Sequence, residues 1–82
     1  MKIQYQSSVK VPAGWRSVNV VATCTRVSPG MAIVESVDLI DGEKPSYGQT
    51  RTGAKRQEFN GRFWASCEVG KKKRLSACTI LE

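Results

Sequence analysis

The stretch KRQEFNGRFWASCEVGKKKR, residues 55–74, decides how the rest of the chain is expected to fold. Its Asn60-Gly61 dipeptide lies between two strand-like runs, and both residue types tolerate the positive φ angles of a type I′ turn. A two-residue turn at this point places Phe59 directly opposite Arg62. The dipeptide therefore predicts a β-hairpin in the last third of the chain.

A second turn, at residues 70–72, would fold the C-terminal strand back onto this hairpin. In that register Glu68 faces Arg74, so opposite charges meet on one face of the ribbon and apolar residues meet on the other. The pattern predicts a basic hairpin ribbon over residues 55–82.

The first forty residues are expected to form a three-stranded antiparallel meander. Apolar and polar residues alternate with period two through residues 2–11, 17–27 and 31–40, and turns containing proline and glycine separate the three runs. Glu35 interrupts the third run, which indicates a bulge or an edge position. The residues predicted to face the core are Ile3, Tyr5, Val9, Val11, Val18, Val20, Ala22, Cys24, Met31, Ile33, Val37 and Leu39.

Residues 41–54 form a polar segment in which neither a helix nor a strand period is present. Connections of this length often carry function. No stretch combines a 3.6-residue apolar repeat with a helix cap, so no helix is expected. The sequence predicts an all-β fold: a small antiparallel barrel or sandwich of five to six short strands, of OB or SH3 size, with a long loop after the third strand.

The chain length of 82 residues predicts a single domain, for which a homodimer would add buried area. The N-terminus lacks the apolar region of a signal peptide and no apolar run is long enough to cross a membrane, so a cytoplasmic protein is expected. The three cysteines are odd in number and widely spaced, which favours buried reduced thiols over disulfides. The chain has no histidine, and no zinc site is expected.

Positive charge is concentrated in the second half of the chain. Residues 1–43 contain four basic and four acidic residues, whereas residues 44–82 contain nine basic and three acidic residues and so supply the whole net charge of +6. This asymmetry indicates a polyanionic partner. The alternative is that cationic turns keep a small domain soluble and protect its sheet edges from pairing.

Catalytic motifs are not found in the sequence. Residues 48–55 superficially match a phosphate-binding P-loop, but Lys55 comes one residue late and Arg56 follows where a Ser or Thr should bind magnesium. Without histidine or an activated nucleophile, neither an enzyme nor a bound cofactor is expected.

An aromatic and basic surface is the better candidate for function. If Ala65 and Val69 face the core, the alternation of side chains along a strand places Arg62, Trp64 and Glu68 on the outer face. Exposed rings that stack on bases, combined with cations that neutralise phosphates, are typical of proteins that bind single-stranded DNA or RNA with little sequence specificity. The predicted contact residues are Tyr47, Arg51, Lys55, Arg56, Phe59, Arg62, Trp64, Lys71, Lys72, Lys73 and Arg74.

Two of the aromatic residues and the function itself have alternative interpretations. Phe59 and Trp64 are also candidates for the core, and Trp15 is expected to close one end of the barrel rather than to bind a base. The competing function is a protein-interaction module or inhibitor, such as a phage- or plasmid-encoded accessory protein, which would bind its partner with little dependence on salt. In architecture alone, the plan resembles phage single-stranded-DNA-binding proteins and OB folds.

Overall fold

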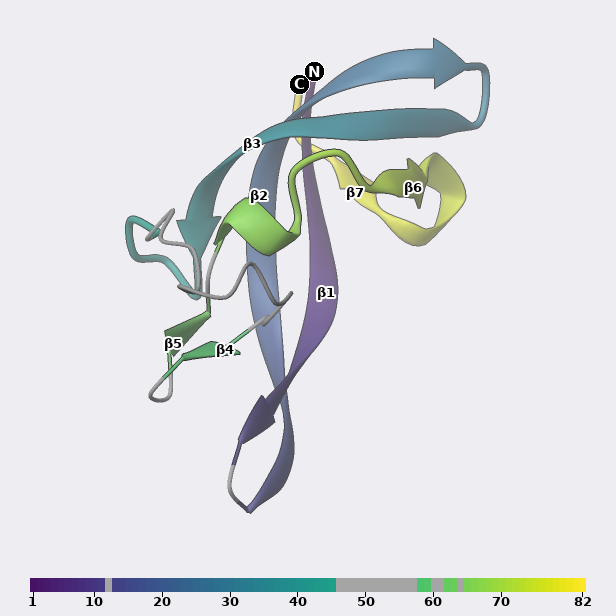
Figure 1. Cartoon of the computed structure of the whole chain (residues 1–82). Coiled ribbons are helices and arrows are strands. Elements are labelled where there is room, and N and C mark those ends of the chain that lie inside the picture. Colours follow the sequence, from purple (N-terminus) through teal and green to yellow (C-terminus); the bar gives the residue numbers. More distant parts are fainter. Residues whose placement is uncertain (12, 46–57, 60–61, 64) are drawn as a thin grey trace.

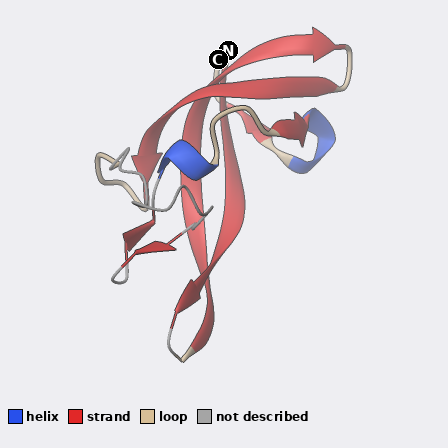
Figure 2. Ribbon diagram, viewed as in Figure 1, coloured by secondary structure: helices blue, strands red, loops and turns tan. Residues whose placement is uncertain are grey.

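The computed structural model describes residues 1–11, 13–45, 58–59, 62–63 and 65–82. Strands dominate this part of the chain, and its two helices are short 3-10 segments (Figure 2). Five antiparallel strands form a curled sheet that closes about half of a barrel (Figure 1). The predicted all-β fold is therefore confirmed, whereas the expectation of no helix is wrong at the two 3-10 segments.

The N-terminal meander is formed as predicted. Strands β1 (Lys2–Val11), β2 (Gly14–Ser28) and β3 (Met31–Ile40) pair with their neighbours in antiparallel order. β2 begins earlier than expected because the register with β1 continues to the pair Val11 and Gly14. Gly14 has a φ of 133°, a backbone conformation that residues with a Cβ atom rarely adopt.

β3 contains two bulges, at Glu35 and Asp38. Neither residue has a partner in β2, since Cys24 pairs with Val34 and the next pair is Thr23 with Ser36. An extra residue in one strand moves the side chains that follow to the opposite face of the sheet. The bulge expected at Glu35 is confirmed.

These bulges determine which residues of β3 enter the core. Ala32 and Val34 are buried before the first bulge, and Val37 is buried after it. The predicted inward set for β3 was a simple alternation that included neither bulge. It is correct at Val37, which lies between the bulges, and wrong before the first bulge and after the second. The incorrect members are the half-buried Met31 and Ile33 and the exposed Leu39.

A separate hairpin contains β4 (Glu58–Phe59) and β5 (Arg62–Phe63). Phe59 pairs with Arg62, which confirms the register that the predicted two-residue turn requires, although the turn itself lies outside the described residues. β4 contacts β1, so this hairpin lies beside the N-terminal strand of the main sheet.

The C-terminal segment completes both edges of the main sheet. β6 (Lys72–Arg74) pairs with β3, β7 (Thr79–Ile80) pairs with β1, and the strand order is β6-β3-β2-β1-β7. The 3-10 helices η1 (Ala65–Cys67) and η2 (Leu75–Ala77) precede and follow β6. Covering these edges satisfies backbone groups that the meander alone would leave unpaired.

The predicted C-terminal ribbon is therefore wrong. Glu68 does not pair with Arg74, because η1 replaces the expected strand and Gly70, with a φ of 88°, turns the chain toward β3. The Gly70 N–H donates to the Val34 carbonyl at 2.8 Å, and the Val34 N–H donates to the Lys71 carbonyl at 3.0 Å. Backbone pairing with β3 thus replaces pairing within the ribbon.

The core lies on the concave face of the curled sheet, where η1 and η2 supply Ala65 and Leu75. Cys24 is buried and Cys78 is half-buried, both as free thiols. No helix within the described ranges is long and apolar enough to cross a membrane. The buried apolar residues are Ile3, Tyr5, Val18, Val20, Ala22, Cys24, Ala32, Val34, Val37, Ala65 and Leu75.

Candidate functional site

A buried carboxylate organises the basic C-terminal segment. Glu68, which the sequence placed on the outer face, is 0% exposed, and its Oε1 accepts a hydrogen bond of 2.7 Å from the Tyr5 hydroxyl. The Nζ of Lys71 lies 2.7 Å from Oε2, and the Nζ of Lys73 lies 3.5 Å from Oε1. Lys73 also lies over the Tyr5 ring, 4.2 Å from its centroid. A buried charge is tolerated when it is paired in this way.

The surroundings of Glu68 keep it ionised. Burial alone raises the pKa of the Glu68 carboxyl group, but hydrogen bonds from Lys71 and Tyr5 and the charges of Lys71 and Lys73 outweigh burial, so the pKa is lowered. Burial, followed by the hydrogen bond to Glu68, raises the pKa of Tyr5 far above its ordinary value. Tyr5 therefore remains a neutral hydrogen-bond donor and is not suited to act as a base.

The run from Lys71 to Arg74 is divided between two faces. Lys73 pairs with the fully buried Ala32, so it lies on the concave side of the sheet with Glu68. Lys72 and Arg74 flank it in the same strand and therefore lie on the outer face, where both are exposed. Neither of these two side chains forms an ion pair within the described part of the chain.

Most of the other predicted contact residues cannot be placed against this run. Phe59 and Arg62 are paired in the β4–β5 hairpin beside β1. The structure thus brings together Lys71 to Arg74 in one segment and Phe59 with Arg62 in another. The predicted contacts outside the described residues are Tyr47, Arg51, Lys55, Arg56 and Trp64.

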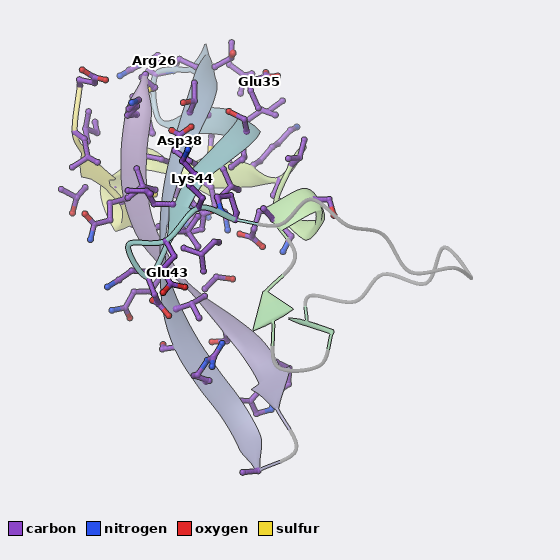
Figure 3. All side chains as sticks on the ribbon, turned by 90° about the vertical axis from the view of Figure 1, so that its left-hand side faces the viewer. Arg26, Glu35, Asp38, Glu43 and Lys44 are labelled. Carbon is purple, nitrogen blue, oxygen red and sulfur yellow. The ribbon has the colours of Figure 1, made fainter. Side chains whose placement is uncertain are left out.

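Acidic side chains gather along β3 and the turn after it, on the side shown in Figure 3. Glu35, Asp38 and Glu43 lie there together with Lys44 (Figure 3). The Asp38 carboxylate accepts a hydrogen bond of 2.8 Å from the Thr23 hydroxyl, a neutral donor. Arg26 is labelled in the same view, so two basic side chains accompany the three carboxylates on this side of the molecule (Figure 3).

Trp15 is a candidate residue that sequence reasoning missed. It is 70% exposed, which contradicts its predicted role as a plug for the barrel end. The signal was present in the sequence, because the core residues Val18 and Val20 are even-numbered and period two places an odd-numbered residue of the same strand on the other face. Arg16, also exposed, follows it.

In the described part of the chain, no group of three histidine, cysteine or acidic residues could hold a metal ion. Comparisons with protein-family models, with curated proteins and with solved structures find no match to this chain.

Proposed function

We propose that this protein binds nucleic acid, with little sequence specificity, through exposed cations of its C-terminal half. The observation that carries the proposal is the orientation of Lys72 and Arg74 on β6. Both are exposed and lack an ion pair within the described residues. The nearby Glu68 is buried and paired with Lys71 and Lys73, and Glu82 is paired with Lys2. The outer face of β6 therefore presents positive charge that no ion pair neutralises within the described residues.

The spacing of these cations suits a linear polyanion. Alternate residues in a strand lie on the same face, about 6.6 Å apart along it. On β3 their partners are Ile33 for Lys72 and Met31 for Arg74, both uncharged. Contacts of this kind neutralise phosphates irrespective of the bases attached to them.

Edge protection is the simplest competing explanation. β6 lies at one edge of the sheet, and charged residues on edge strands prevent pairing with other chains. The two explanations differ in what they predict for binding, because edge protection requires no affinity for a polyanion.

The double variant Lys72→Gln/Arg74→Gln tests the proposal. For a single-stranded oligonucleotide, each phosphate contact contributes about −0.7 to the slope of log K against log salt concentration, so the variant should lower the steepness of this slope by about 1.4. The matched control is Lys2→Gln/Lys44→Gln, which removes two exposed cations from other parts of the surface. This control should leave the slope close to that of the wild type.

Three results would count against the proposal. Absence of nucleic-acid binding by the wild type at low salt would refute it, and salt-independent binding would refute phosphate contacts. An equal loss of slope in both double variants would show that net charge, rather than the outer face of β6, is responsible.

A further inference from the structure

The paired ends of β1 and β2 project from the rest of the molecule. We call residues 7–11 and 14–18 the β1–β2 arm; its tip extends away from the sheet body in Figure 1. In β2, the first buried residue is Val18, and the preceding residues from Gly14 to Ser17 are exposed or half-buried. On the β2 side of the arm, the side chains of residues 15–17 are therefore exposed to the solvent, and the core begins at Val18.

The largest side chain on this arm is the indole of Trp15. Its 70% exposure is higher than that of the other exposed large hydrophobic residues in the described chain. Its cross-strand partner is Lys10, and the next pair on the same face joins Ser8 and Ser17. A large flat ring thus stands on a narrow ribbon among small polar and basic residues.

This setting favours one type of partner over others. A protein-binding hot spot normally lies at the centre of a surface that excludes water, and membrane insertion requires several apolar side chains. Neither pattern fits a single indole beside two serines. The arm contains the basic residues Lys10 and Arg16 and no acidic residue, which suits a negatively charged ligand.

We propose that Trp15 stacks on an unpaired base of a single-stranded nucleic acid. This inference rests on the proposed function and makes it more specific. Bases inside a duplex are already stacked on both sides, whereas an unpaired base has a face free for an aromatic ring. The arm thereby gives the protein a preference for single strands, which the cations of β6 alone would not provide.

Substitutions at Trp15 in the full chain test the stacking. Trp15→Ala should weaken binding to a single-stranded oligonucleotide by about 5- to 150-fold, the range measured for loss of one stacked base, and should change duplex binding little. Trp15→Phe should retain most of the affinity, since phenyl rings also stack. Trp15→Leu keeps an apolar side chain without a ring and should behave like Trp15→Ala.

Two further measurements make the test specific to this residue. Val27→Ala is the matched control, because Val27 is 49% exposed near the tip of the β2–β3 hairpin; this variant should bind as the wild type does. The chain has two tryptophans, so Trp64→Phe leaves Trp15 as the only indole, whose fluorescence single strands should quench. Should Trp64→Phe fail to fold, loss of part of the quenching in Trp15→Phe gives the same information.

The outcomes separate this inference from the proposed function. If the wild type binds neither single strands nor duplexes, the proposed function itself fails. If the wild type binds but Trp15→Ala binds single strands equally well, the arm has no role in binding and only this inference fails. If Trp15→Leu binds single strands with full affinity, the contact is apolar rather than a stacked ring, and the inference is also refuted.

Discussion

Replacing Tyr5 by Phe removes one oxygen atom from the interior and leaves the other contacts of Glu68 in place. The Tyr5 hydroxyl donates a hydrogen bond of 2.7 Å to the Glu68 carboxylate, and both side chains are buried. The Phe ring can still lie beneath the ammonium group of Lys73, which is 4.2 Å from the ring centroid. The substitution therefore isolates the hydrogen bond from the packing of the ring.

The expected loss follows from the charge of the acceptor. A hydrogen bond to a charged group contributes about 1.5–3 kcal/mol to stability, compared with about 1 kcal/mol for a neutral pair. Water cannot replace the lost donor easily, because Glu68 is 0% exposed. In a domain of this size each kcal/mol lowers Tm by about 4–8 °C, so Tm should fall by about 6 °C or more.

Urea unfolding at neutral pH, followed by circular dichroism, measures this loss as a shift in midpoint at constant m value. The matched control is Thr23→Val, which removes a hydroxyl that donates to Asp38 at 2.8 Å in a part-buried position. The free energy of unfolding of that variant should fall by about 1 kcal/mol or less, because solvent can reach the Asp38 carboxylate. A loss below about 0.5 kcal/mol for Tyr5→Phe, the range of ordinary surface substitutions, would refute the role assigned to Glu68.

Two further predictions concern the same segment. The pKa of Glu68 is lowered by folding, so the unfolded state binds the proton more readily; its contribution to stability is present above the ordinary glutamate pKa of about 4.3 and is lost as pH falls through the lower folded value. Thermal unfolding between neutral and strongly acidic pH should therefore show a smaller acid-dependent fall in Tm for Glu68→Gln than for the wild type, and parallel curves would contradict this. Gly70→Ala should lower the free energy of unfolding by about 1–2 kcal/mol, because Gly70 has a φ of 88° that residues with a Cβ atom rarely adopt. An added Cβ atom would meet no other atom, so backbone strain is the only cost. Gly30→Ala, where φ is not positive and the space is also open, is the control for urea unfolding; equal losses in the two variants would rule out strain at Gly70.

The meander could be predicted from the sequence because its information is local. Period-two alternation identifies β1 to β3, and the two-residue turn fixes the pairing of Phe59 with Arg62. The bulge at Glu35 was also visible as an interruption of the pattern. Several residues of β3 were nevertheless assigned to the wrong face, because each of its two bulges reverses the alternation and neither was included in the assignment.

The C-terminal segment could not be predicted in this way because its contacts are distant in sequence. Lys71 and Lys73 are close to Glu68 in sequence, but Tyr5, which also donates to the buried carboxylate, lies 63 positions away. Charge patterning treated Glu68 as a surface residue, which is the usual place for glutamate. Local pairing within a ribbon gave a consistent register, but the free edge of β3 offered a competing partner that no local pattern reveals.

The candidate site was likewise predictable only in part from the sequence. The sequence identified Lys71 to Arg74 as a basic run, but only the structure separates the two lysines that contact Glu68 from the exposed Lys72 and Arg74. For Trp15, by contrast, the sequence was sufficient, since the alternation of side chains along β2 already indicated that it points away from the core.

Binding of the wild-type protein to a single-stranded oligonucleotide, titrated at about 50 and 200 mM salt, tests the central claim most directly. Contacts from Lys72 and Arg74 alone predict that affinity falls by about sevenfold over this range, and additional contacts from the arm would make the fall steeper. Binding that is equally tight at both salt concentrations, or no binding at the lower one, would contradict the claim that these cations form a nucleic-acid surface.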